Sequence, residues 1–195
     1  MELMGKRIGF AITGSFCTYE QIKPAIEGLI ENGANVLPIL SYSAAGHDTR
    51  FMKAADLRGY LEETTKNKVL DSIVEVEPIG PKKLLDLVII APCTGNTLAK
   101  LALGITDTPV LLAAKSHLRN ARPVLIAVST NDALGANAKN MGLLLNTRNV
   151  YFVPYRQDNA TEKNTSIVAD MGLIVDAAKL ALESRQMQPI MLESR

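Results

Sequence analysis

The chain has 195 residues, of which 47% are hydrophobic and 21% are charged, a balance typical of a globular protein with a substantial core. Its 21 basic and 20 acidic side chains give a net charge of +1, which predicts neither a nucleic-acid partner nor a membrane surface. No apolar run is long enough to span a bilayer, and the first residues lack the apolar core of an export signal. We therefore expect a cytoplasmic protein without a metal site, in which Cys17 and Cys93 are buried, inert thiols.

Apolar runs alternate with segments of helical spacing, which predicts repeated strand–helix–strand units. In chain order we expect a strand at 7–13, a helix at 18–32, a strand at 35–40, a polar loop at 41–49, a helix at 50–63 and a short strand at 71–76. A fully apolar, central strand at 87–90 follows, and then a turn at 91–96, a helix at 97–103 and a short helix near 110–115. The chain continues with a strand at 123–128, a helix at 137–146, a last strand at 150–153 and a closing helix at 167–184. Right-handed crossovers make this an α/β fold, a three-layer doubly wound parallel sheet of the flavodoxin-like or Rossmann-like kind. We expect one domain over 1–195, whose tail at 186–195 is either frayed or docked on another subunit.

Four polar turns follow predicted strands: Thr13-Gly14-Ser15, Ser41-Tyr42-Ser43, Thr94-Gly95-Asn96-Thr97 and Ser129-Thr130-Asn131-Asp132. In doubly wound sheets, ligands bind outside the carboxyl ends of the strands, where the strand order reverses. Gly14 permits a close backbone approach, Ser15 offers a hydroxyl, and the following helix offers free N–H groups, which together suit a phosphate. Neither G-x-G-x-x-G nor G-x-x-x-x-G-K-[ST] is present, so the pattern indicates neither an NAD nor an ATP cradle. The alternative is that these Ser and Thr residues are only helix N-caps.

Several single residues are candidates for chemistry near these turns. Asn131 can hydrogen-bond a substrate carboxylate, although an Asx-turn explains an Asn-Asp pair equally well. His47 follows the Ser43 turn and can move protons near neutral pH, so Asn131 and His47 are the catalytic candidates. Lys100 is a second candidate for the substrate, with a solvated helix position as the alternative. Asp132 is either an acid or base or the N-cap of the next helix, and His117, between Lys115 and Arg119, is expected to be exposed.

The stretch LDLVIIAPCTGNTLAKLALGITD, residues 85–107, resembles the signature of the flavin-containing cysteine decarboxylase-like family. The resemblance implies a flavodoxin-like fold and FMN bound between the subunits of a trimer, so that the chain forms a trimer-based homo-oligomer. It also implies which residues contact FMN: Gly14, Ser15, Phe16, Ser41, Ser43, Thr94, Gly95, Asn96 and Thr97.

Two departures from the family pattern bear on the reaction. Members of this family that decarboxylate carry a histidine eight residues before the aspartate that matches Asp86, and here Pro78 stands there. Their P-x-M-N motif, which grips the substrate carboxylate, aligns with residues 128–131, where Asn131 is retained and the Pro and Met are not. The acid–base histidine is therefore missing, which argues against decarboxylation of a peptidyl cysteine.

A closer resemblance covers essentially the whole chain, through GKRIGFAITGSFCTYE, DSIVEVEPIGPK, APCTGNTLAKLA, TDTPVLLAAK, RNARPVLIAVSTNDALG and QPIMLES. These phrases are similar to the small-subunit family of the bacterial oxidoreductases that form pyridine-2,6-dicarboxylate during sporulation. The resemblance implies oxidation of a dihydropyridine dicarboxylate in the mother-cell cytoplasm, with a dehydrogenase-like A subunit that carries NAD(P). The alternatives are an FMN-dependent decarboxylase or prenyl transferase that acts alone, and a non-catalytic partner that stabilises the A subunit.

Overall fold

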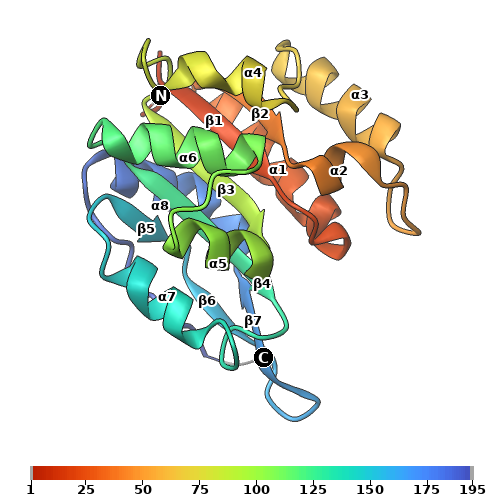
Figure 1. The fold of residues 1–195 in the computed structure, drawn as a ribbon, viewed down its shortest axis with the longest axis vertical. Helices are drawn as coiled ribbons and strands as arrows, with labels where there is room; N and C mark the ends of the chain where they lie inside the picture. Colours follow the sequence, from red (N-terminus) through yellow and green to blue (C-terminus); the bar gives the residue numbers. More distant parts are fainter. Residues whose placement is uncertain (1, 194–195) are drawn as a thin grey trace.

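The fold is built on a seven-stranded sheet, which a computed structural model describes over residues 2–193 (Figure 1). The strand order is β2-β1-β3-β4-β7-β6, and β5 pairs with the first half of β4. Strands β1 to β5 are parallel, whereas β7 runs antiparallel to both β4 and β6. The strands are β1 (Arg7–Ile12), β2 (Asn35–Leu40), β3 (Leu87–Cys93), β4 (Val124–Thr130), β5 (Val150–Phe152), β6 (Tyr155–Asn159) and β7 (Lys163–Ala169).

Helices cover both faces of this sheet, which makes three layers. In Figure 1, α5, α6 and α7 lie in front of the sheet, and α1 and α8 lie behind it. Every residue of β3 is buried, as a central parallel strand covered on both faces requires. The helices are α1 (Tyr19–Glu31), α2 (Tyr42–Gly46), α3 (Ala54–Thr65), α4 (Ile73–Val76), α5 (Gly95–Ala102), α6 (Pro109–Arg119), α7 (Ala138–Leu145) and α8 (Ile174–Leu182), with 3-10 turns η1 (Phe16–Thr18), η2 (Glu77–Ile79) and η3 (Met171–Leu173).

The predicted three-layer, doubly wound α/β class is confirmed, but the C-terminal third differs from the prediction. The strand at 150–153 is not the last, because β6 and β7 follow it as an antiparallel hairpin. The closing helix begins at Ile174, not at 167. Residues 167–169 belong to β7, which pairs with Ser129 and Thr130 of β4. Asp170 then ends the strand, because its side chain accepts a hydrogen bond from the N–H of Gly172 and starts η3.

Local capping explains two further corrections. The short strand expected at 71–76 is wrong: Ser72 accepts a hydrogen bond from the N–H of Glu75 and starts α4 there. The polar loop expected at 41–49 contains α2, which Ser41 caps through the N–H of Ala44.

The other predicted helix starts and ends shift by a few residues for similar reasons. Helix α3 begins at Ala54, four residues late, where the carboxylate of Asp48 accepts a hydrogen bond from the N–H of Ala54. The turn expected at 91–96 is shorter, because β3 continues through Cys93 and α5 already begins at Gly95.

The C-terminal tail docks on its own chain as far as the structure describes it, to residue 193. The side-chain amide of Gln186 donates to the carbonyl of Phe152 at 2.7 Å and accepts from its N–H at 2.8 Å. Tyr155 at the start of β6 then pairs with the backbone of Ile190 and Leu192. Over these residues the tail is docked and not frayed, and the surface that holds it belongs to the same chain.

His117 is buried in α6, with 2% of its surface exposed, so its expected exposure is wrong. Its charged neighbours Lys115 and Arg119 are two residues away on each side, and such positions point to different faces of a helix. Within residues 2–193, its Nε2 is the one buried side-chain nitrogen or oxygen without a hydrogen-bond partner. Burial, together with the nearby Arg122, lowers the pKa of His117 from 6.5 to about 4.

This lowered pKa predicts a loss of stability on mild acidification. Between pH 6.5 and pH 4, the unfolded chain binds a proton at His117 that the folded chain does not bind, so the free energy of unfolding falls as the pH falls. We expect a loss of about 2 kcal/mol from this residue between about pH 7 and pH 5. The His117→Gln variant should lose that part of the pH dependence in urea-unfolding measurements. The His47→Gln variant, at an exposed histidine, serves as the control and should keep it. Equal slopes for His117→Gln and wild type would contradict this account.

Candidate functional site

The carboxyl ends of β1 and β3 are joined by the hydroxyl of Thr13, which is 1% exposed. This hydroxyl donates a hydrogen bond to the carbonyl of Pro92 at 2.6 Å and accepts one from the N–H of Thr94 at 3.0 Å. The phenol of Tyr19 in α1 donates to the carbonyl of Thr13 at 3.0 Å. The first and third polar turns are therefore fixed to each other by a buried side chain.

These turns surround a hollow of about 610 Å³, here called the cradle hollow, at the carboxyl edge of the parallel strands. Three of the four predicted turns border it, together with the start of α6 and the end of α5. Its lining residues are Thr13, Gly14, Phe16, Ser41, Tyr42, Ser43, His47, Asp48, Thr49, Thr94, Asn96, Thr97, Lys100, Asp107, Thr108 and Leu111. Sequence reasoning missed Thr108 and Leu111, although Thr-Pro at 108–109 is a common way to begin a helix.

The turns of the cradle hollow can cap helices and still offer hydroxyl groups to a ligand. Ser41 caps α2, and Thr94 caps α5 by accepting a hydrogen bond from the N–H of Thr97 at 3.3 Å. The Thr94 hydroxyl also donates to the Thr97 hydroxyl at 3.1 Å, which leaves the hydrogen of the latter free for a ligand. Within residues 2–193, the Ser43 hydroxyl has no hydrogen-bond partner. The N-cap prediction is thus correct for Ser41 and Thr94, while free donors still face the hollow.

The residues present fit a phosphate group. A Cβ atom at Gly14 would lie 3.3 Å from the Cβ of Ser43, so the absence of a side chain lets the first two turns lie close together. The first N–H groups of α5, at Gly95 and Asn96, have no partner within the helix and carry its positive end. Lys100 borders the same hollow, and its Nζ lies 2.6 Å from Oδ2 of Asp107. The donors are hydroxyls and backbone N–H groups beside one balanced cation, a set that suits a phosphate ester.

A second hollow, of about 680 Å³, lies toward the β6–β7 hairpin and is here called the hairpin hollow. Gly14, Phe16 and Thr94 border both hollows. Ser15 lines the hairpin hollow and not the cradle hollow, and its hydroxyl lies 2.8 Å from the hydroxyl of Ser129. Its place differs from the expectation that it faces the same cavity as Ser41 and Ser43.

The other predicted site residues divide between the two hollows. Gly95 and Asn131 line the hairpin hollow, whereas His47 and Lys100 line the cradle hollow. The two catalytic candidates, His47 and Asn131, therefore face different cavities. Nδ1 of His47 lies 3.1 Å from the carbonyl of Ser43, on an exposed rim. Sequence reasoning also missed Arg50 of the hairpin hollow, because it placed Arg50 in the helix expected at 50–63, which begins only at Ala54.

A buried polar network stands behind Gly95. The Thr130 hydroxyl and the Asn137 amide donate to the two carboxylate oxygens of Asp132 at 2.6 and 2.8 Å, and Asn140 donates to Asn137 at 2.8 Å. A Cβ atom at Gly95 would come within 2.7 Å of Asp132, and within 2.5 Å of Thr130. Only glycine fits there. Both oxygens of Asp132 are engaged, so it is neither the N-cap of α7, which begins after Asn137, nor a free acid or base.

Neither the two thiols nor Pro78 has a role in the binding that these hollows suggest. Cys17 and Cys93 are free, as predicted, but Cys17 is exposed, which corrects its expected burial. Cys93 is fully buried, and burial raises the pKa of its thiol. Pro78 lies in η2, which packs against α6, and borders neither hollow. Within residues 2–193 no group of acidic, histidine or cysteine side chains is arranged to hold a metal.

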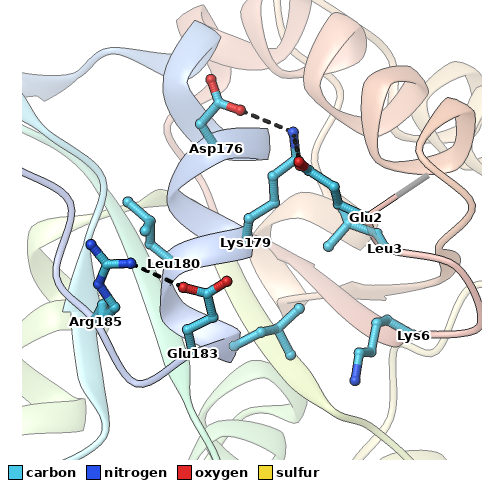
Figure 2. A pocket seen from close by; sticks show the side chains of 9 residues that line it. Glu2, Leu3, Lys6, Asp176, Lys179, Leu180, Glu183 and Arg185 are labelled. Atoms are coloured by element: carbon cyan, nitrogen blue, oxygen red, sulfur yellow. Dashed lines mark hydrogen bonds and ion pairs between the residues drawn. The ribbon is translucent and has the colours of Figure 1, made fainter.

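A third hollow, of about 710 Å³, lies before the amino end of β1, between the N-terminal residues and α8 (Figure 2). Most of its charged side chains, with the exception of Lys6, pair with one another. Figure 2 shows Lys179 between Glu2 and Asp176, at 2.7 and 3.2 Å, and Arg185 beside Glu183, at 3.2 Å. Exposed pairs of this kind contribute little to stability, and they leave little net charge for a ligand. Although it is larger, this hollow is a less suitable binding site than the cradle hollow.

No helix within residues 2–193 has the length and hydropathy needed to cross a membrane.

The fold is similar to that of several solved structures. A structure of the B subunit of dipicolinate synthase from Bacillus halodurans C superposes with a TM-score of 0.92 at 42% identity, and the match covers 100% of both chains. The structure of the FMN-dependent cysteine decarboxylase SpaF, at 18% identity, shares the fold with a TM-score of 0.65 over 93% of this chain and 97% of its own.

The sequence comparisons point to the same relatives as the comparison of folds. The B subunit of dipicolinate synthase of Bacillus subtilis (strain 168) is 47% identical over 193 residues, which are 99% of this chain and 96% of that protein. The family model named Flavoprotein matches residues 1–182. The chain belongs to the flavoprotein family.

Proposed function

We propose that the chain binds FMN in the cradle hollow and is the B subunit of an oxidoreductase that forms pyridine-2,6-dicarboxylate with a nicotinamide-binding A subunit. One observation carries the proposal: three polar turns meet at one strand edge, where Gly14, without a side chain, lets the first turn lie close to Ser43. The similarity to the B subunit of dipicolinate synthase over 99% of the chain supports the reaction, and the FMN-dependent relative of the same fold supports the cofactor.

Each part of the cradle hollow has a role in this proposal. The N–H groups at the start of α5 and the Thr97 hydroxyl hold the phosphate, with Ser43 on the opposite side. Thr94 keeps α5 in place by capping it. Lys100 borders the hollow and stays paired with Asp107, so it brings no uncompensated charge. Bound FMN supplies a two-electron acceptor for hydride.

The remaining residues are assigned to the substrate. Conversion of a dihydropyridine to a pyridine removes a hydride and a proton, so the site needs a base as well as a hydride acceptor. His47 lies on the exposed rim of the cradle hollow and is our candidate for the base. Asn131 borders the hairpin hollow and is our candidate for a contact to the substrate carboxylate.

The alternative is that the chain is a decarboxylase that acts alone. The fold that the chain shares with SpaF supports this alternative. It is weakened by Pro78, which stands where the decarboxylases carry histidine, and which lies away from both hollows. Release of carbon dioxide from a carboxylated thiol would support that alternative.

We further propose that the chain assembles as trimers, with the cradle hollow near the contact between copies. We also propose that it acts in the mother-cell cytoplasm.

The first prediction concerns FMN binding to the purified chain. Gly14→Val should weaken FMN binding at least about tenfold, because its side chain fills the space between the first two turns. The thermal midpoint of unfolding, measured on the same variant, shows separately whether the close contact with Ser43 destabilises the fold. Gly59→Ala is the matched control: a Cβ there meets nothing within 4 Å, and its FMN affinity should equal that of wild type. Equal FMN affinity of Gly14→Val and wild type would refute the proposed phosphate seat.

The second prediction concerns reconstitution with the A subunit. Formation of pyridine-2,6-dicarboxylate should need both subunits, and addition of the wild-type chain should raise the rate at least about tenfold over the A subunit alone. The Gly14→Val chain should give most of that increase only at raised FMN concentration, because its affinity for FMN is lowered. If the A subunit alone reaches the full rate, the chain is a stabilising partner without a catalytic role.

A further inference from the structure

The hairpin hollow has the size and the lining of a second ligand site. It lies between the first turn, the loop that carries Arg50 and Phe51, and the strands β6 and β7. We propose that this hollow binds a small planar dicarboxylate, with Arg50 as the side chain that anchors one carboxylate. This inference rests on the proposed function and deepens it, since it assigns a place to the dicarboxylate of that reaction.

Arg50 lines the hairpin hollow and carries a positive charge that can bind a carboxylate. Its guanidinium carbon lies over the ring of Phe51, 4.8 Å from the ring centroid. A guanidinium held over an aromatic face keeps its N–H groups available at its edge, where a carboxylate can accept two parallel hydrogen bonds. No carboxylate within residues 2–193 lies at ion-pair distance from it. Arg156 and Arg185, which also border surface hollows, are both paired with acids.

The opposite wall of the hairpin hollow offers neutral donors for the second carboxylate. Ser15 and Ser129 share one hydrogen bond at 2.8 Å, so one of the two hydroxyls donates and the other keeps a hydrogen for a ligand. The side-chain amide of Asn131 borders the same hollow and has no partner within the described residues. Lys163 lies on the rim, but its Nζ is paired with Asp158 at 2.8 Å. Arg50 is therefore the uncompensated positive charge of this hollow.

The two hollows are also neighbours, because Gly14, Phe16 and Thr94 border both. A molecule in the hairpin hollow lies next to the first turn, on whose other side the cradle hollow holds the proposed cofactor. Hydride transfer requires the substrate and the hydride acceptor to lie next to each other. The three residues that border both hollows place the two proposed sites side by side.

The experiment is calorimetric titration of the full-length chain with pyridine-2,6-dicarboxylate, with and without saturating FMN, in metal-free buffer. Benzene-1,3-dicarboxylate, which has the same two carboxylates and no ring nitrogen, and pyridine-2-carboxylate, which has one carboxylate, are the comparison probes. We expect both dicarboxylates to bind, and the monocarboxylate to bind at least about tenfold more weakly. Arg50→Gln should weaken dicarboxylate binding at least about tenfold, and Arg50→Lys should restore part of it.

The control variant is Arg148→Gln, at an exposed arginine that borders neither hollow, and it should bind like wild type. Equal dicarboxylate affinity of Arg50→Gln and wild type would overturn the proposal, as would no binding to wild type under either condition. FMN titrated into the same variants separates the two claims. Arg50-dependent dicarboxylate binding without FMN binding supports this site and rejects the proposed cofactor, whereas FMN binding without dicarboxylate binding does the reverse.

Discussion

The hydroxyl of Thr13 holds together the strand ends on which the rest of the site depends. This hydroxyl is buried. It donates a hydrogen bond to the carbonyl of Pro92 in β3 and accepts one from the N–H of Thr94, the residue before α5. At this point β3 shifts its register against β4, between Ile90 and Cys93, so the strand pairing alone does not place the third turn. On the other side of β3, its pairing with β1 ends at Ala11 and Ile90, and beyond that point the Thr13 hydroxyl, used as donor and acceptor, continues the contact. The position of α5, and with it the edge of both hollows, follows from this contact.

The site is built from groups that stabilise the fold at the same time. Thr94 caps α5, Ser41 caps α2, and their partners leave other donors of the same turns open. Behind α5, the engaged carboxylate of Asp132 fixes Thr130 and Asn137 so closely that only glycine fits at position 95. A donor set held in this way is preorganised, because little conformational entropy is lost when a ligand binds.

Much of this could be predicted from local sequence, and the rest depends on tertiary contacts. The apolar run at 87–90 and the polar turn after it predicted both a central strand and a site, because a fully buried parallel strand has a distinctive pattern. Strand β7 could not be separated from the following helix, since Ile167 and Val168 suit either element and only pairing with β4 decides. The placement of Ser15 beside Ser129, 114 residues away, has no local signal. The same holds for Arg50, whose loop is held by the side chains of Thr49 and Asp48, which accept hydrogen bonds from the N–H groups of Met52 and Ala54.

The central claim is that the turns around Gly14, Ser43 and Thr97 form a phosphate seat. The most direct measurement compares the affinity of the purified chain for FMN and for riboflavin, which differ only in the phosphate. The donors of the cradle hollow predict that FMN binds at least about a hundredfold more tightly, the equivalent of two or more charge-assisted hydrogen bonds. Equal affinities, or no binding of FMN at all, would contradict the account.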